Sequence, residues 1–137
     1  MSDITDHPER AMQAFAEDAL ALQTATERRD YSAVHFAILQ EITQAPNGAT
    51  PSDLAARWNS SPTGISKILA SMDRLGHVSA VLDARDRRIR RYFVTDAGFD
   101  LVEKWFVAKG FSRDAVAPYR AQLALTNPFL KKGKSRG

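Results

Sequence analysis

The 137-residue sequence contains no cysteine, which excludes disulfide bridges, thiolate metal sites and thiol-based redox switches. It also lacks any run of about 18 apolar residues, so it predicts no membrane-spanning helix. The acidic segment 1–6 has no apolar stretch of the kind that a secretory signal needs. We therefore expect a cytoplasmic protein.

Residue patterns for catalysis and for metal binding are missing as well. His7, His35 and His77 have no ligand-like spacing, and neither a nucleophile–base motif nor a glycine-rich phosphate loop occurs. Asp53 and Asp73 are better explained as charges at helix ends than as catalytic acids. We therefore expect no enzyme, no metal site and no cofactor.

The composition is that of one folded domain with an uneven distribution of charge. Apolar residues make up 44% and charged residues 26% of the chain, and its length suits a single domain, residues 1–137. The net charge is −5 over residues 1–49, but +4 over residues 50–95 and again +4 over residues 96–137. This asymmetry indicates an anionic partner for the basic parts, and nucleic acid is the commonest such partner.

Helical periodicity marks both ends of the chain. Apolar residues at helical spacing predict helices over residues 8–28 and 32–45, a long helix from about residue 96 to 109, and a last helix over residues 112–125. Residues 131–137 form a basic tail. The chain is thus expected to be mainly helical.

Two helix starts follow each other closely in the middle of the chain. Thr50 and Ser61 each combine a capping side chain with a following proline, which suits the first turn of a helix. They predict a short helix that ends near Asn59 and a second helix over residues 62–75, closed by Gly76. Two helices separated by about three residues are typical of a helix-turn-helix.

A β-hairpin is expected directly after this pair. Residues 78–82 and 91–95 are rich in β-branched and aromatic side chains, and the polar, basic stretch 83–88 separates them. A helix fits the major groove of DNA, and the tip of a basic hairpin can enter the neighbouring minor groove. We therefore predict an α+β fold, mainly helical with a small hairpin, namely a winged helix-turn-helix with flanking dimerisation helices.

The segment from His35 to Trp105 resembles the MarR (multiple antibiotic resistance regulator) family of winged-helix regulators. Residues 83–88 (DARDRR) match the family's D-x-R-D-x-R wing motif, and residues 94–98 (VTDAG) match its [LV]-T-x-x-G junction. Residues 54–55, Ile65 and residues 72–78 (MDRLGHV) are similar to its L-A…v…L-E-x-x-G-x-V run. The resemblance implies a homodimeric regulator, expected to be a repressor, that binds double-stranded DNA at a pseudo-palindromic operator.

The helix over residues 62–75 is the expected recognition helix, because residues on the early turns of such a helix meet base edges. Ser and Thr can bond to bases or phosphates, and a lysine can reach either. For Ser61, the plain alternative is that it only caps the helix. The DNA-binding candidates of this helix are Ser61, Thr63, Gly64, Ser66, Lys67 and Arg74.

The resemblance assigns roles within the wing. Arg88 would enter the minor groove, Asp86 would orient it, and an ion pair of Asp83 with Arg85 would hold the loop. The alternative is a run of charges that is merely solvated. The DNA-binding candidates of the wing are Arg85, Asp86, Arg87, Arg88 and Arg90, of which Arg87 and Arg90, like Arg91, are equally well explained as phosphate contacts or as surface charges.

Dimerisation is expected because a two-fold operator needs two winged lobes. We expect residues 32–95 to form the DNA-binding lobe, with the helices over residues 8–28 and 96–125 interlocking between two copies. Trp58 and Trp105 are expected in the core or at an interface. The dimer-interface candidates are Met12, Phe15, Leu22, Val102, Trp105, Phe106, Val116, Tyr119 and Leu123.

Some alternatives stay open at this point. The family resemblance suggests a cleft for a small-molecule effector, lined by Phe15, His35, Phe36 and Trp105, but core packing explains these residues equally well. Ser60 departs from the family, which has an apolar residue at that place in the turn. The rival functions are a winged helix that contacts proteins and a non-specific DNA-binding protein that acts through its basic tail.

Overall fold

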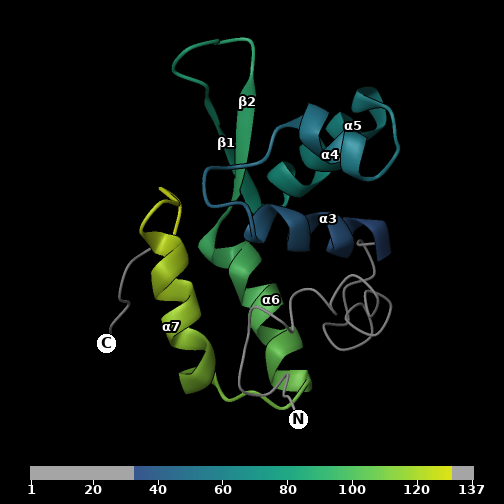
Figure 1. The fold of residues 1–137 in the computed structure, drawn as a ribbon. Helices are drawn as coiled ribbons and strands as arrows, with labels where there is room; N and C mark the ends of the chain where they lie inside the picture. Colours follow the sequence, from purple (N-terminus) through teal and green to yellow (C-terminus); the bar gives the residue numbers. More distant parts are fainter. Residues whose placement is uncertain (1–32, 131–137) are drawn as a thin grey trace.

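The computed structural model describes residues 33–130, so the helix expected over residues 8–28 and the basic tail 131–137 lie outside the described residues. The elements follow one another as α3 (Ala33–Thr43), α4 (Pro51–Arg57), α5 (Pro62–Arg74), β1 (Val78–Leu82), β2 (Arg90–Val94), α6 (Asp96–Ala108) and α7 (Arg113–Ala124). The hairpin projects from the end formed by α3, α4 and α5, whereas α6 and α7 run antiparallel in the opposite direction (Figure 1). The predicted helix-turn-helix and its wing are confirmed.

The starts of α4 and α5 are set by their capping side chains. The Thr50 hydroxyl accepts a hydrogen bond from the amide of Asp53, and the Ser61 hydroxyl accepts one from the amide of Gly64, each at 3.1 Å. Between the two helices, Asn59 adopts a φ of +50°, a region that asparagine tolerates better than most residues. The amide of Ser60 then donates to the carbonyl of Ala55 at 2.9 Å, which closes the turn.

The wing is an antiparallel hairpin that is supported only at its root. The register pairs Val78 with Val94 at the root and Leu82 with Arg90 near the tip. On the other edge of β2, Tyr92 exchanges two backbone hydrogen bonds of 2.9 Å with Ala49, from the loop that follows α3. The outer half of the hairpin therefore extends beyond the body of the protein.

One apolar core lies where the helices and the root of the wing meet. The buried side chains come from α3, α4, α5, β1, β2, α6 and α7. Helix α5 turns one face inward, as the periodicity predicted, whereas α3 is buried on nearly all sides, since residues 36–40 are all buried. The largest fully buried side chains are Phe36, Ile38, Leu39, Ile42, Ile65, Phe99, Trp105 and Phe106. None of the helices within residues 33–130 is both long and apolar enough to cross a bilayer.

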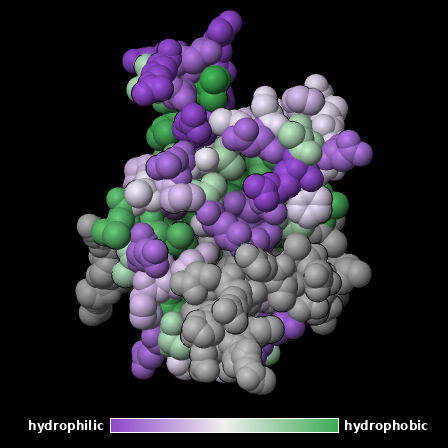
Figure 2. Space-filling view, in the orientation of Figure 1, coloured by the Kyte–Doolittle hydropathy of each residue, from purple (hydrophilic) through white to green (hydrophobic). Residues whose placement is uncertain are grey.

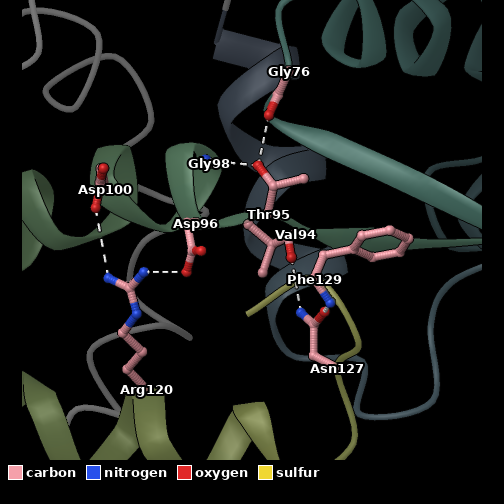
Figure 3. A network of polar contacts seen from close by, with 9 residues as sticks. All are labelled: Gly76, Val94, Thr95, Asp96, Gly98, Asp100, Arg120, Asn127 and Phe129. Atoms are coloured by element: carbon pink, nitrogen blue, oxygen red, sulfur yellow. Dashed lines mark hydrogen bonds and ion pairs between the residues drawn. The ribbon is translucent and has the colours of Figure 1, made fainter. Parts of the chain in front are cut away.

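The junction between β2 and α6 explains why a threonine and a glycine stand at positions 95 and 98. The Thr95 hydroxyl caps α6 by accepting from the amide of Gly98 at 3.1 Å, and it donates to the carbonyl of Gly76 at 2.6 Å (Figure 3). A Cβ atom on Gly98 would lie 2.1 Å from the carbonyl oxygen of His77. The backbone of α6 can approach the start of the hairpin this closely only because residue 98 has no side chain.

We therefore expect Gly98→Ala to lower the free energy of unfolding by about 1–3 kcal/mol, the usual range for overpacking a tight contact. Urea unfolding followed by circular dichroism measures this change. Gly64→Ala is the matched control, because its new Cβ would meet only the Ser61 hydroxyl, at 3.3 Å. The control is expected to change stability by less than about 1 kcal/mol. Equal effects of the two substitutions would contradict the tight contact at Gly98.

Candidate nucleic-acid interface

The recognition-helix candidates lie on the solvent face of α5. Ile65, Leu69 and Met72 are buried against the core, which leaves the opposite face of the helix exposed. Thr63, Lys67 and Arg74 are spaced so that they share this face, and all three are exposed. Ser66 is exposed next to Lys67, whereas Gly64 is partly covered. The helix therefore presents a polar stripe with two cations to solvent.

Ser61 has the structural role that was weighed as the alternative to DNA contact. Its hydroxyl oxygen is engaged as the N-cap of α5. The residue is nevertheless exposed, and a serine hydroxyl that accepts a hydrogen bond can still donate its own proton. The cap fixes where α5 begins, and with it the positions of the side chains on the first turn.

The wing tip is shaped by the carboxylate of Asp83. Its Oδ1 accepts from the backbone amides of Arg85 at 2.7 Å and Asp86 at 3.3 Å, while its Oδ2 lies 2.9 Å from the Arg91 guanidinium. The amide bonds, chiefly that of Arg85, and the Arg91 side chain hold the pKa of Asp83 below its ordinary value. The carboxylate thus folds the loop and ties it back to β2.

This arrangement corrects one expectation. Asp83 was expected to form an ion pair with Arg85, but the structure pairs its carboxylate with Arg91 across the hairpin and uses only the backbone of Arg85. The physical reason is that the carboxylate is turned into the loop, where the amide of Arg85 is within reach. The side chain of Arg85 is left exposed at the tip.

The expected role of Asp86 has a clear geometric counterpart. Its two carboxylate oxygens accept from Nε and Nη2 of Arg88, each at 3.0 Å, and Oδ1 also accepts from the Arg88 backbone amide at 3.1 Å. The Arg88 side chain lowers the pKa of Asp86, and the same contact raises the pKa of Arg88. The Arg88 side chain is 89% exposed, so this fork fixes its direction without covering it.

The remaining wing arginines enlarge the positive charge of the tip. Arg85, Arg87 and Arg90 are exposed, whereas Arg91 is half-buried in its pair with Asp83. Residues 83–91 carry five arginines against two aspartates. In the space-filling view, strongly hydrophilic residues gather at the projecting tip (Figure 2). A surface of this kind attracts polyanions.

A groove of about 660 Å³ separates the wing from the helix-turn-helix. One wall consists of wing residues 88–92, and the other of residues 50–53 at the start of α4 together with Ser66 of α5. The sequence reasoning did not include residues 50–53 in the site. The sequence feature that could have indicated these residues is the helix cap at Thr50, but it was interpreted only as the start of a helix. The groove brings Ser66 of α5 to the same surface as Arg88 and Arg90 of the wing.

Ser60, which departs from the family, and its neighbour Trp58 do not disrupt this arrangement. Trp58 is partly buried and packs against the core, as expected. The hydroxyl of Ser60 donates to the carbonyl of Trp58 at 3.4 Å. The turn is thus closed by backbone hydrogen bonds and a polar side chain, and α5 begins at Pro62 as predicted.

Several interface candidates lie inside the core of a single chain. Val102, Trp105, Phe106 and Val116 are at most 1% exposed, and Tyr119 is 7% exposed, so in this arrangement they have little surface for a partner. Leu123 is partly buried. Their apolar stripes serve intrachain packing of α6 and α7 here. Met12, Phe15 and Leu22 lie outside the described residues.

The residues expected to line an effector cleft are also buried or partly buried in the structure. Phe36 and Trp105 are fully buried, so they pack in the core and do not line an open cavity. His35 is partly buried, with its Nε2 atom 3.3 Å from the hydroxyl of Ser71 on α5. Phe15 lies outside the described residues. Within residues 33–130, no group of three or more potential ligand side chains is arranged to hold a metal ion.

The Asp86–Arg88 fork yields a pH prediction. Because Arg88 lowers the pKa of Asp86, the carboxylate is expected to titrate below 3.8, and the fork is lost only as the pH falls through that lowered pKa. Carboxylate carbon shifts in an NMR titration measure this midpoint. In Arg88→Ala, the midpoint of Asp86 should move upward. An unchanged midpoint would contradict the fork.

Comparisons with known proteins agree with the geometry. The model of the MarR family matches residues 29–89. A MarR family transcription regulator, SP03579, has a similar structure at 27% identity, with 89% of each chain covered and a TM-score of 0.55. A mutant MarR from E. coli, solved with operator DNA, is similar at 19% identity and a TM-score of 0.56. The match covers 90% of the present chain and 98% of the E. coli chain.

FabT from Streptococcus pneumoniae, solved in complex with DNA, is similar at 19% identity, with 86% and 90% coverage and a TM-score of 0.53. The search of curated proteins finds no match. The family match covers the helix-turn-helix, β1 and the whole wing motif, and the shared fold extends over 89% of the chain. The chain therefore has the winged-helix fold of these regulators, and its helix-turn-helix and wing motif are similar to those of the MarR family of transcription regulators.

Proposed function

We propose that this protein binds double-stranded DNA as a homodimer and represses transcription at a pseudo-palindromic operator. The observation that carries the proposal is the groove in which the wing faces the start of α4 and Ser66 of α5, next to the exposed polar stripe of α5. Two relatives of the same fold were solved with DNA. Repression needs only that the bound dimer occupies DNA that the polymerase must use.

In this proposal, α5 reads the major groove. Thr63, Gly64, Ser66 and Lys67 lie on its first turns, where side chains reach base edges, and Ser61 can contact a phosphate. Arg74, about two turns further along the same face, is suited to the phosphate backbone. The buried face of α5 keeps these side chains in a fixed order along the groove.

The wing supplies the second contact. Arg88 enters the minor groove, where a guanidinium is attracted by the negative potential. Asp86 holds Arg88 in a defined direction and so reduces the conformational entropy that the side chain loses on binding. Arg85, Arg87 and Arg90 add phosphate contacts, which increase affinity and salt dependence but carry no sequence preference.

The dimer is proposed because a single lobe contacts only one half-site. We retain the division expected from the sequence, with residues 32–95 as the DNA-binding lobe and residues 8–28 and 96–125 as the dimerisation helices. The buried positions of α6 and α7 limit their share of the interface, so the N-terminal candidates become the main ones. A function on chromosomal DNA also agrees with the predicted cytoplasmic location.

We expect Arg88→Ala to weaken binding to the DNA upstream of the protein's own gene by about 10- to 100-fold. This is the usual loss of affinity when an arginine that contacts base edges is removed. Arg113→Ala is the matched control, because Arg113 is also highly exposed (75%) but lies at the start of α7. The control should change affinity by less than about 2-fold, the size of one weak surface charge interaction. Fluorescence anisotropy at several salt concentrations, with an unrelated duplex for comparison, measures both.

Three outcomes would contradict this proposal and separate its rivals. Equal affinity for both duplexes, lost on deletion of residues 131–137, would indicate non-specific binding through the tail. No measurable affinity for any duplex in a random-sequence selection would favour a winged helix that contacts proteins. An Arg88→Ala variant with unchanged affinity would show that the wing is not the minor-groove contact.

Sedimentation velocity tests the dimer separately. The wild-type protein is expected to sediment as a dimer at micromolar concentration, and Phe15→Asp to shift it toward the monomer, because a charge buried in an apolar interface is strongly unfavourable. Gln13→Asp places the same charge in the same segment and should have little effect. A monomeric wild-type protein would contradict the proposal.

A further inference from the structure

Strand β1 forms one edge of the wing, and its outer half borders no other element of residues 33–130 on the side away from β2 (Figure 1). Ala80 lies opposite Tyr92 in the register of the hairpin, and Tyr92 directs its own amide and carbonyl away from β1, to Ala49. Ala80 and Tyr92 are therefore a non-hydrogen-bonded pair, and the backbone groups of Ala80 face the free edge. Because the pattern alternates along an antiparallel pair, the backbone groups of Leu82 face this edge too.

Two backbone hydrogen bonds at the ends of the hairpin agree with this alternation. The amide of Asp83 donates to the carbonyl of Ile89 at 2.9 Å, and the amide of Thr95 donates to the carbonyl of His77 at 3.1 Å. The odd-numbered residues between His77 and Asp83 are thus the ones that bond to β2. Among residues 33–130, no backbone hydrogen bond from another element reaches the even-numbered residues 80 and 82. Their amides and carbonyls are left to solvent.

The exposed edge of β1 lacks the features that usually protect such a strand. Val78–Leu82 contains neither a charged residue nor a proline, and its pairing with β2 is continuous, without a bulge. Val81 is 39% exposed and Leu82 is 48% exposed. As neighbours in a strand they point to opposite faces. The edge therefore combines free backbone groups with an exposed apolar side chain on each face, which suits the addition of another strand.

The charge next to this edge indicates which kind of strand fits. Val81 lies opposite Arg91, and Leu82 lies opposite Arg90, so each apolar side chain has an arginine behind it on β2. Residues 83–91 carry five arginines against two aspartates. Pairing with the same edge of a second copy would bring two such positive tips together, and like charges repel. An acidic segment is attracted instead.

We propose that an extended acidic segment of a partner protein adds to the two-stranded wing along β1. Its backbone exchanges hydrogen bonds with Ala80 and Leu82, its apolar side chains cover Val81 and Leu82, and its carboxylates face the arginines of the tip. Because the same arginines are directed at phosphates in the proposed function, the segment competes with DNA. The competition rests on that proposed function, whereas the addition of the strand does not.

A blocked peptide of about six alternating glutamate and valine residues is the probe, because this is the commonest strand length. In the free protein, the amides of Ala80 and Leu82 should exchange with solvent faster than the amide of Val81, which is bonded to β2. The bound probe should slow the exchange of Ala80 and Leu82 and leave that of Val81 nearly unchanged. Hydrogen exchange followed by NMR measures these rates. The expected Kd is on the order of 0.1–1 mM, since ordering the free peptide offsets much of the gain.

Two altered peptides separate backbone pairing from attraction by charge alone. The same peptide with all its amides methylated keeps the carboxylates and side chains but cannot donate to β1. The peptide with lysine in place of glutamate keeps the donors but has the opposite charge. Each should bind at least about 10-fold more weakly than the probe, because each loses one of the two contributions.

A substitution in β1 tests the same contact from the side of the protein. Leu82→Pro removes an amide that faces the free edge and takes no part in the hairpin, a place where a strand tolerates proline. It should abolish binding of the probe. Leu82→Thr is the matched control, since it keeps the amide, and it should weaken binding by less than about 3-fold. Slow exchange of the Asp83 amide reports that the hairpin is still folded; if it is not, the methylated peptide tests the contact on the unaltered protein.

Three results would overturn the proposal. Absence of probe binding to the wild type is the first. Equal binding of the methylated peptide, without slower exchange of Ala80 and Leu82, would mean that charge alone attracts the probe. Exchange of these two amides that slows as the concentration of the free protein rises would mean that a second copy covers the edge.

The proposed DNA-binding function fails or stands independently of these results. The peptide titrations contain no DNA, whereas the affinity of the peptide-free protein for its upstream DNA tests that function alone. If this affinity exists, saturating probe should weaken it about 2-fold or more in the wild type and leave it unchanged in Leu82→Pro. Equal weakening in both proteins would overturn the competition.

Discussion

The contact between the first turn of α6 and the start of the hairpin is the constraint on which the rest of the structure depends. Gly98 lets the α6 backbone approach the carbonyl of His77, and the Thr95 hydroxyl bonds on both sides of the junction. The two ends of the hairpin are thereby joined to one helix. Because the outer wing has only two strands, its direction is decided at this root and at the bridge to Ala49.

The charges of the wing have two distinct tasks. The two aspartates shape the loop, since a carboxylate offers only acceptors and can serve backbone amides and a guanidinium together. An asparagine in place of either aspartate would turn its NH₂ group, a donor, toward a backbone amide or an arginine that is itself a donor. Arg91 is used in this internal pairing, whereas Arg88 is oriented but remains exposed. The number of arginines in the motif therefore overstates the number directed at a ligand.

Local chemistry made much of the fold predictable. Thr50 and Ser61 each cap a helix where the sequence indicates, because capping depends on residues only two or three positions apart. The Asp83–Arg85 pair was wrong because the loop turns this carboxylate toward backbone amides and brings in Arg91 from the opposite strand. Spacing along the chain does not reveal such a cross-strand partner.

The same limit applies to the surfaces of α6 and α7. An apolar stripe looks alike in a sequence whether it packs within one chain or between two, so Trp105 and Val116 could not be assigned from periodicity alone. The structure also holds a groove of about 430 Å³ between Gln44 and Leu123, which was not predictable because nearly eighty positions separate its walls. Only the packed fold brings the end of α3 beside the end of α7.

The arrangement at the wing root determines what kind of regulation the fold can support. Val94, Thr95 and Asp96 are consecutive, and they are bound by Asn127, Gly76 and Arg120, respectively. A change in α7 therefore acts on the direction of the wing, whereas the exposed stripe of α5 takes no part in these contacts. In the proposed function, sequence preference lies with α5, and orientation lies with the contacts that position the protein.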